Sequence, residues 1–327
     1  EAVGVCMRAL ESIRAAGAVI VATSGNHDSA ARLGATGSFA AAGGLHLRTR
    51  VAELDTPVLL ADEHGEVAFY GVPFLEPDTA RHALAQPGAR THAAVLGAAM
   101  DRVRDDLAAR SGTRGAGLRS VVLAHAFVVG AQAAGSERSI SVGGVETVPA
   151  TVFDGVDYVA LGHLHSPQTL TERVRYSGSP LPYSFGERNH RKAVWLVDLD
   201  ATGLAEVREL ALPVVRGLSE IEGTLPQLLE NPEFADAQAN YVSAVLTDEV
   251  RPLEAMRRLQ ERFPGAVHLE WRRPAGHQAL RYVERVRGRS DAQVARSFLT
   301  DVRSQPGAAE ARWVESAFAA AGAGPPP

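Results

Sequence analysis

Three short apolar runs, each followed at once by a polar segment with histidine, most constrain what this chain can fold into. The runs at 18–22 and 158–161 lead into Ser24–Asp28 and Gly162–His165, and the run at 121–124 ends at His125. Short apolar runs separated by helical patterns are typical of buried strands in α/β sheets. Because functional groups gather at the carboxyl ends of such strands, we expect the three polar segments to meet at one site.

The rest of the first 212 residues supports an α/β fold. Residues 91–110 have the periodicity of a helix, and strand-like runs follow at 174–176, 193–199 and 204–212. Alternating strands and helices that give way to consecutive strands predict a two-sheet α/β sandwich. We therefore predict a first domain at 1–212 with the fold of a two-sheet sandwich.

The pattern changes near Pro213, where we place a second domain at 213–272. Its periodicity predicts a small αβαβ unit, with helices at 218–229 and 252–263 and strands at 241–246 and 267–271. The remaining residues, 273–327, should hold a polar linker, two helices broken at Pro306-Gly307 and a disordered tail.

Charge and cysteine content limit the possible functions. The net charge is −5, so any binding of nucleic acid must depend on a local site or on a partner. The single cysteine, Cys6, excludes an internal disulfide, and no apolar run reaches the length of a membrane span. These features predict a cytoplasmic protein with no membrane association.

The residue types at the three strand ends are those of a metal site. Imidazoles and the amide oxygen of Asn26 are ligands for divalent transition metals. His163 and His165 lie two apart in a loop that leaves a strand, so they could serve neighbouring ions that clamp a phosphodiester. His27 would lie beside the metals, with Asp28 behind it to orient the imidazole.

Each of these residues also has a structural interpretation. A lone histidine at a strand end is usually structural, Asn26 alone suits a turn, and Asp28-Ser29 alone suits a helix N-cap. Their occurrence together at three strand ends favours the metal site over these alternatives.

Longer motifs extend this interpretation to a family. The Gly-Asn-His-Asp and Gly-His-x-His motifs resemble the calcineurin-like metallophosphoesterase superfamily, and the residues around them are similar to the SbcD exonuclease family. The stretches that carry the resemblance are Ser24–Ser29, His125, Ser136–Ser139, Asp157–His165, Arg175–Leu181 and Ser184–Glu187.

The resemblance implies roles for individual residues. Asn26, His125 and His163 would bind the second of two divalent metal ions, and His165 would bind the first. His27 would be the catalytic histidine, oriented by Asp28. The implied ion is manganese, with magnesium as the alternative.

The resemblance also implies an activity and partners. Members of this family are metal-dependent 3′→5′ double-strand exonucleases and single-strand endonucleases of DNA repair and recombination. The implied assembly is a homodimer bound to an SMC-like ATPase, SbcC, acting on DNA in the cytoplasm at the nucleoid.

The chain departs from the family pattern at its N-terminal end. The family's D-x-H and G-D motifs, which supply the remaining ligands and a bridging carboxylate, do not precede the helix expected at 2–16. We therefore expect an N-terminal truncation, a missing first strand, and little or no nuclease activity from the chain as given. The alternatives are a non-catalytic subunit that only binds the ATPase, or an enzyme acting on a small phosphodiester.

Two further features have open interpretations. Arg138 and Arg188 flank the motif loops and are candidates for contact with the DNA backbone, while an arginine-rich stretch at 272–289 either contacts phosphates or forms a solvated linker. The apolar faces of the C-terminal helices either pack on their own domain or dock on the ATPase partner.

Overall fold

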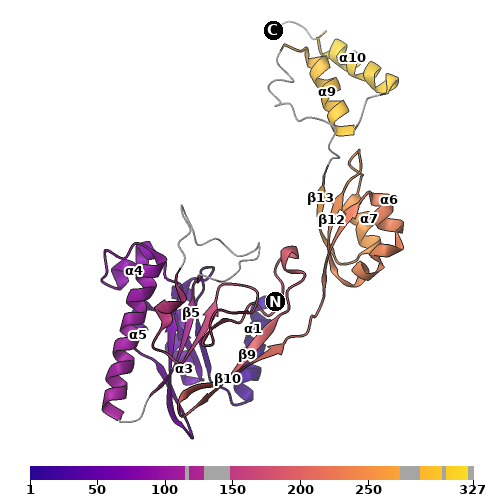
Figure 1. Ribbon diagram of the computed structural model, residues 1–327. Helices are drawn as coiled ribbons and strands as arrows, with labels where there is room; N and C mark the ends of the chain where they lie inside the picture. The colour runs from indigo at the N-terminus through magenta and orange to yellow at the C-terminus, as the bar shows by residue number, and fades with distance from the viewer. Residues whose placement is uncertain (115–117, 129–147, 273–287, 304–306, 323–327) are drawn as a thin grey trace. The chain divides into compact units, whose positions relative to one another are not determined.

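The computed structural model describes residues 1–114, 118–128, 148–272, 288–303 and 307–322. The chain divides into two compact units, Glu1–Val214 and Val215–Pro327 (Figure 1). Across the described ranges, no helix is long and apolar enough to cross a membrane.

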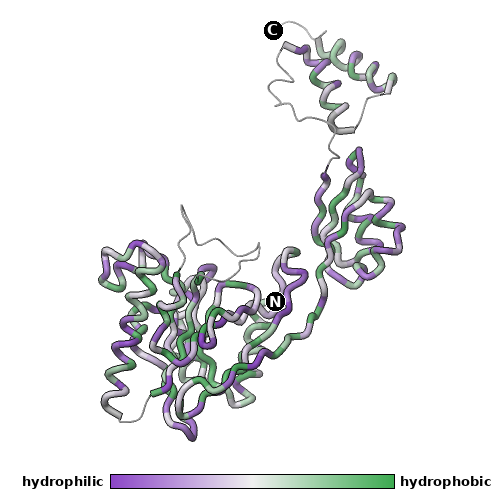
Figure 2. Tube along the Cα trace, in the orientation of Figure 1, coloured by the Kyte–Doolittle hydropathy of each residue, from purple (hydrophilic) through white to green (hydrophobic). Residues whose placement is uncertain are grey.

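The first unit is built on a six-stranded sheet with the strand order β3-β4-β5-β6-β8-β7. Strands β4, β5, β6 and β8 are parallel, and the edge strands β3 and β7 pair antiparallel with their neighbours. Figure 2 shows hydrophobic residues along the strands of this unit. The bounds are β3 Val58–Asp62, β4 Gly65–Val72, β5 Arg119–His125, β6 Tyr158–Gly162, β7 Gln168–Thr169 and β8 Val174–Tyr176.

Helices cover one face of this sheet. Helix α5 (His92–Arg114) packs its buried stripe against the strands, with α4 (Pro77–Ala83) beside it (Figure 1). The stripe consists of Val95, Ala99, Met100 and Val103, all fully buried at a spacing of three to four residues. The predicted helix at 91–110 is therefore confirmed.

A hairpin of β9 (Ala193–Asp200) and β10 (Gly203–Ala211) covers the opposite face of the sheet. Its residues Val197, Leu199 and Leu204 pack against a second apolar cluster that includes Val67 and Val121. Two strand layers thus face each other, with helices outside one of them. This mixed α/β architecture agrees with the predicted fold class.

A separate parallel pair, β1 (Ile20–Thr23) and β2 (Leu45–Arg48), carries the first histidine motif. Strand β1 lies beside β4 and β5. The Phe74 amide at the end of β4 donates a hydrogen bond of 2.9 Å to the Ser24 carbonyl at the end of β1. This bond fixes the Ser24–Asp28 turn at the edge of the sheet where β5 ends.

Short helices complete the first unit. Helix α1 (Ala2–Ala15) precedes β1 and buries none of its residues. The others are α2 Ala30–Leu33, η1 Gly34–Thr36, α3 Gly37–Ala42, η2 Val51–Glu53, η3 Ala150–Phe153 and η4 Phe185–Glu187.

The second unit contains a three-stranded parallel sheet, β11-β12-β13, with two helices and a 3-10 segment. Its core includes Leu228, Leu259 and Phe263, which are fully buried. The bounds are β11 Leu218–Gly223, α6 Leu225–Glu230, η5 Pro232–Ala239, β12 Tyr241–Leu246, α7 Ala255–Arg262 and β13 Ala266–Trp271.

The prediction of a helix at 218–229 is wrong for its first half. Residues 218–223 form β11, so the order of elements is βαβαβ and not αβαβ. The Thr224 side chain caps helix α6 in a capping box with Gln227, and Pro226 lies in its first turn. These residues start the helix at Leu225, which leaves the preceding segment to pair with β12.

Two helices at the C-terminal end contact each other: α9 (Asp291–Arg303) and α10 (Ala308–Gly322). An ion pair joins Arg296 and Glu315 across them. The predicted helix pair is confirmed. Residues 273–287 of the expected linker and the tail at 323–327 lie outside the described residues.

Candidate metal centre

The strand ends of β5 and β6 bring two of the predicted ligands together. These parallel strands pair His125 with Gly162, so His163 follows directly beyond the paired position. The centroids of the His125 and His163 rings are 5.3 Å apart, with the rings nearly perpendicular. Residues 38 positions apart in the chain therefore meet because the strands are neighbours in the sheet.

Asn26 joins these histidines from the end of β1. Its Oδ1 lies 3.0 Å from Nε2 of His125. Two ligands that bind one ion at about 2.1 Å and at right angles lie about 3.0 Å apart. The two side chains form a hydrogen bond in the structure, and its length equals the spacing of two adjacent ligands of one metal ion.

Two glycines allow the His125 ring to lie between the motif loops. A Cβ atom on Gly25 would meet Cε1 of the ring at 2.6 Å, and a Cβ atom on Gly162 would meet Nδ1 at 3.0 Å. A side chain at position 25 would therefore force the ring to move, and one at position 162 would displace it by a few tenths of an ångström. The first residues of the two sequence motifs are therefore glycines because both abut the same imidazole.

His163 adopts a backbone conformation that residues with a side chain rarely adopt. Its φ is 116°, and positive φ values outside glycine cost on the order of 1–3 kcal/mol. Such strain is concentrated at functional sites, where surrounding structure enforces it. The conformation supports a functional role for the loop after β6.

The pKa of His125 depends on each of the other titratable residues predicted for the site. Burial and, to a smaller extent, the neighbouring His163 lower the pKa of His125 to about 4. Asp28 raises this pKa, while His27 and His165 lower it. Each of these groups therefore lies near enough to act on the charge of His125.

His27 and Asp28 occupy the exposed rim of this cluster. The Asp28 carboxylate accepts a hydrogen bond of 2.7 Å from the Gly25 amide, so it closes the turn that holds Asn26. Among the hydrogen bonds of the described residues, none joins Asp28 to His27. The side chain of Ser29 caps α2 by accepting from the Arg32 amide.

His165 contacts two residues to which the sequence analysis assigned no role in the site. Its Nδ1 lies 2.9 Å from Oε1 of Glu187, and Oε2 of Glu187 accepts a hydrogen bond of 2.8 Å from Lys192. Glu187 and Lys192 are buried, with 1% and 4% of their surface exposed. These residues lie 22 and 27 positions from the histidine, so no local pattern predicts their contact with it, although Glu187 ends one of the stretches that carry the family resemblance.

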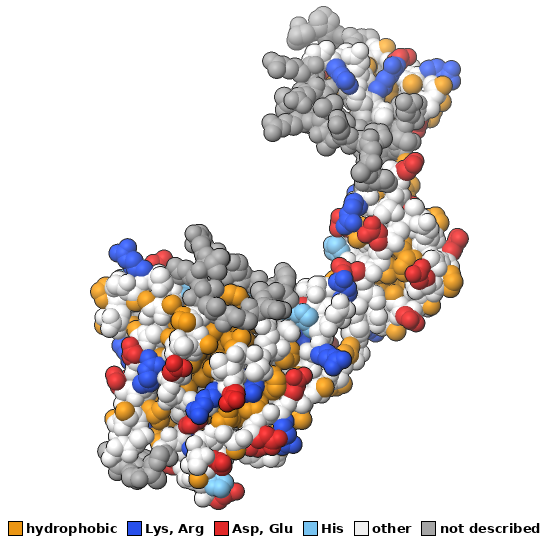
Figure 3. All heavy atoms as spheres, in the orientation of Figure 1, with side chains coloured by type: hydrophobic (Ala, Val, Ile, Leu, Met, Phe, Trp, Pro, Cys, Tyr) orange, Lys and Arg blue, Asp and Glu red, His pale blue; other side chains and the backbone are white. Residues whose placement is uncertain are grey.

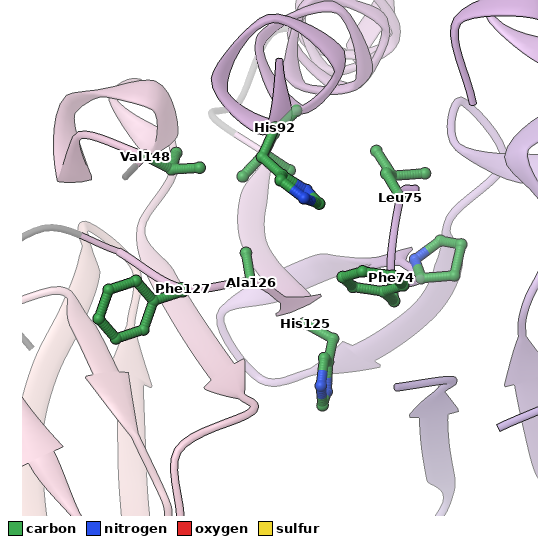
Figure 4. Close-up of a pocket in the computed structure, with 9 residues that line it drawn as sticks. Phe74, Leu75, His92, His125, Ala126, Phe127 and Val148 are labelled. Atoms are coloured by element: carbon green, nitrogen blue, oxygen red, sulfur yellow. The ribbon is translucent and has the colours of Figure 1, made fainter. Parts of the chain in front are cut away.

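Aromatic residues surround the cluster. Phe74 lies 6.2 Å from the ring of His125, Phe127 lies 6.2 Å from that of His163, and Tyr183 lies 5.6 Å from that of His165. Figure 4 shows Phe74 beside His125, with Ala126 and Phe127 following it along the chain. Phe74 and Phe127 thus lie against His125 and His163, whereas Tyr183 beside His165 is exposed.

The donors that meet here fit a divalent transition metal in type but not in charge. Imidazole and amide donors suit such ions, yet the Asn26, His125 and His163 side chains bring no negative charge. Over the described ranges, no group of three or more His, Cys, Asp or Glu side chains is placed to hold a metal ion. The described residues therefore supply part of a metal site.

The two arginines proposed to contact DNA differ in what the structure shows. Arg188 is exposed and donates to the Phe185 carbonyl, whereas Arg138 lies outside the described residues. In the arginine-rich stretch, Arg272 pairs with Glu222 at 3.2 Å and Glu270 at 3.4 Å, and residues 273–287 lie outside the described ranges. Figure 3 shows basic and acidic side chains interspersed over the visible surface.

The architecture of the first unit is consistent with a metallophosphoesterase-like α/β fold. Two comparisons with known proteins found similar sequences. Residues 214–303 match the family model described as "Type 5 capsule protein repressor C-terminal domain" (SbcD_C). The chain is also 26% identical over 251 residues to the SbcD component of the SbcCD nuclease of Staphylococcus epidermidis, a match that covers 76% of this chain and 64% of the relative. The chain thus spans less than two thirds of that relative, and it is similar to this SbcD subunit, with the SbcD_C match lying within residues 214–303.

Proposed function

We propose that this chain carries part of the metal site of a DNA nuclease subunit. The observation that carries the proposal is the meeting of Asn26, His125 and His163 from three strand ends, with Asn26 and His125 spaced as adjacent ligands. The name of the Staphylococcus epidermidis relative, a nuclease subunit, supports the same class of activity.

In this proposal, Asn26, His125 and His163 hold one divalent ion, and His165 belongs to a neighbouring ion. When bound, such ions polarise a phosphodiester and activate a water molecule. Manganese is the proposed ion, and magnesium is the alternative. Aromatic residues Phe74 and Phe127 keep the apolar side of the imidazoles dry, which strengthens the interaction of His125 and His163 with a cation.

His27 is the proposed proton donor to the leaving 3′ oxygen. It lies exposed on the rim, where a nucleic-acid strand has access to it. The Asp28 carboxylate holds the turn that carries His27, because it accepts a 2.7 Å hydrogen bond from the Gly25 amide. Arg188, exposed near the same loops, is a proposed contact for the DNA backbone.

The donors that meet in this chain are neutral, which limits what they do alone. Two imidazoles and an amide bind a divalent ion more weakly than a site with a bridging carboxylate. We therefore propose that these donors support little hydrolysis without an anionic ligand. The proposed activities of the complete subunit are 3′→5′ exonuclease action on double-stranded DNA and endonuclease action on single strands, in repair and recombination of nucleoid DNA in the cytoplasm.

A nuclease assay on the complete gene product tests this proposal. With manganese and a linear duplex, we expect His163→Gln to lower the cleavage rate by at least about 100-fold, because it removes a ligand that positions the ion. His64→Gln, at an exposed histidine outside the cluster, is the matched control and should leave the rate unchanged. Equal cleavage by both variants would exclude the proposed site.

A binding role accompanies the nuclease role. The helix pair α9–α10 exposes Phe298, Trp313 and Phe318, with 61%, 76% and 38% of their surface accessible. We propose that this pair docks on an SMC-like ATPase partner, SbcC, and that the chain works as a homodimer in that complex. Trp313→Ala should weaken co-purification with the ATPase while cleavage by the isolated nuclease is unchanged. Unchanged co-purification would exclude docking through this residue.

A subunit that only binds the ATPase is the alternative function. The neutral donor set and the exposed helix pair favour it over an enzyme for small phosphodiesters. Retained co-purification together with an absence of manganese-dependent cleavage in the complete gene product would favour this alternative.

A further inference from the structure

We propose that Glu187, held in place by Lys192, is a positioning residue that selects the tautomer of His165. This inference rests on the proposed function for its purpose, because His165 is there a ligand of a metal ion. The contacts that carry it belong to the chain's own residues. Glu187 reaches His165 from the 3-10 turn η4, and Lys192 follows shortly after it in the chain.

Each oxygen of the Glu187 carboxylate has one short contact, with His165 or Lys192, and one longer contact of 3.3 Å, in which Oε1 accepts from the Ser184 hydroxyl and Oε2 from the Tyr183 amide. Oε1 lies 2.9 Å from Nδ1 of His165, and Oε2 lies 2.8 Å from the ammonium of Lys192. An ionised carboxylate accepts hydrogen bonds and donates none. Because Lys192 balances the charge of this carboxylate, the Nδ1 atom of His165 must carry the hydrogen in the contact.

Lys192 is fixed so that it cannot leave this arrangement. Its three ammonium hydrogens match three acceptors: Oε2 of Glu187 at 2.8 Å, the His165 carbonyl at 2.8 Å and Oγ of Ser179 at 2.9 Å. The residue is 4% exposed, so an ammonium that lost one of these partners would be buried without compensation. Lys192 therefore binds both the carboxylate and the backbone of the histidine that the carboxylate orients.

The consequence concerns the second ring nitrogen of His165. A neutral imidazole carries its proton on one nitrogen and its lone pair on the other. With the proton on Nδ1, the lone pair is on Nε2, the form in which a histidine binds a metal through that atom. The Glu187–Lys192 pair thus prepares His165 to act as a ligand before any ion arrives.

A substitution at Glu187 separates this tautomer role from a packing role. In Glu187→Gln, the amide has one acceptor oxygen and one NH₂ group. Lys192 requires the oxygen, so the NH₂ group turns toward Nδ1 and donates to it. His165 should then shift to the tautomer with hydrogen on Nε2.

The double variant Glu187→Gln/Lys192→Met should reverse that shift. Methionine fills the volume of the lysine stem without an ammonium group. The donor that remains at this position is the Tyr183 amide, whose 3.3 Å contact is longer than that of Lys192, so the amide oxygen can turn back to accept from Nδ1. The tautomer with hydrogen on Nδ1 should therefore return. The double variant carries more changes than the single variant, so damage to packing would not be repaired by it. A role in packing alone predicts no such rescue.

The test is two-bond ¹H–¹⁵N NMR of the metal-free chain labelled at histidine, with His165 assigned through His165→Gln. We expect hydrogen on Nδ1 in the natural chain and the double variant, and on Nε2 in Glu187→Gln. Asp106→Asn, which breaks the Asp106–Arg110 ion pair elsewhere in the unit, is the matched control and should leave His165 unchanged. Hydrogen on Nε2 in the natural chain, or on Nδ1 in Glu187→Gln, would overturn the proposal.

A manganese titration of the same samples separates this inference from the proposed function. Outer partners of metal-binding histidines typically contribute about 10–100-fold to affinity, so Glu187→Gln should weaken binding by that factor and the double variant should restore it. If the tautomer shifts as expected but no sample binds manganese, the positioning role holds and the metal site is refuted. If Glu187→Gln does not fold, the natural chain still tests the proposal, because hydrogen on Nε2 of His165 there overturns it.

Discussion

The hydroxyl of Tyr176 offers a direct test of how the sheet holds the segment that follows His125. Tyr176 is fully buried at the end of β8, and its hydroxyl donates to the Ala126 carbonyl at 2.6 Å while accepting from the Val128 amide at 3.0 Å. One side-chain oxygen therefore satisfies two backbone groups that leave the sheet directly after the candidate ligand. Burial raises the pKa of this hydroxyl, so it keeps its hydrogen at neutral pH.

Tyr176→Phe should destabilise the first unit without removing a candidate ligand. The change leaves the Ala126 carbonyl and the Val128 amide buried without this partner, and each such group costs about 1–3 kcal/mol. We expect the free energy of unfolding of this unit to fall by about 2–4 kcal/mol. Tyr183→Phe, at a tyrosine with 66% of its surface exposed, is the control and should change it by less than about 0.5 kcal/mol.

Urea unfolding followed by the fluorescence of Trp195 measures this effect. The indole of Trp195 donates to the Tyr176 carbonyl at 2.8 Å, so it reports on the strand that carries the mutation. Replacing Trp271 and Trp313 with phenylalanine removes the fluorescence of the second unit. A loss below about 1 kcal/mol in Tyr176→Phe would refute the idea that this hydroxyl bridges the two backbone groups.

Three further changes test other parts of the structure. The pKa of His125 falls from 6.5 to about 4 on folding, so the unfolded state takes up a proton at a higher pH than the folded state. The metal-free chain should therefore lose on the order of 3 kcal/mol of stability as the pH falls from 6.5 to 4. Urea titrations should show this loss in the natural chain but not in His125→Gln. Gly25→Ala places a Cβ against the His125 ring, so thermal unfolding should show a loss of about 1–3 kcal/mol and manganese titration a lower affinity. Thr224→Ala removes the capping box of α6 and should cost the second unit about 1 kcal/mol, measured by Trp271 fluorescence in urea.

The sequence was most informative where strand ends carry unusual residues. Three apolar runs ending in histidine or asparagine predicted that Asn26, His125 and His163 meet, and the parallel pairing of β5 and β6 brings the two histidines together. The amphipathic period of α5 and the break at Pro306-Gly307 also predicted helices that the structure contains.

Other features depended on tertiary structure and could not be predicted from local patterns. Residues 218–223 have apolar positions that suit a helix, but pairing with β12 makes them a strand. Glu187 and Lys192 are charged residues that a local pattern assigns to the surface, yet each is buried because the other compensates its charge. The roles assigned to His27 and Asp28 and the identity of the ion remain predictions.

A manganese titration of the natural chain and three variants tests the central claim most directly. Asn26→Ala, His125→Gln and His163→Gln each remove one proposed donor, while His64→Gln removes an exposed histidine outside the cluster. The account predicts that each donor variant weakens the dissociation constant by at least about 10-fold and that His64→Gln leaves it unchanged. Equal affinity in all variants, or no manganese binding by the natural chain, would contradict the claim that these three strand ends form a metal site.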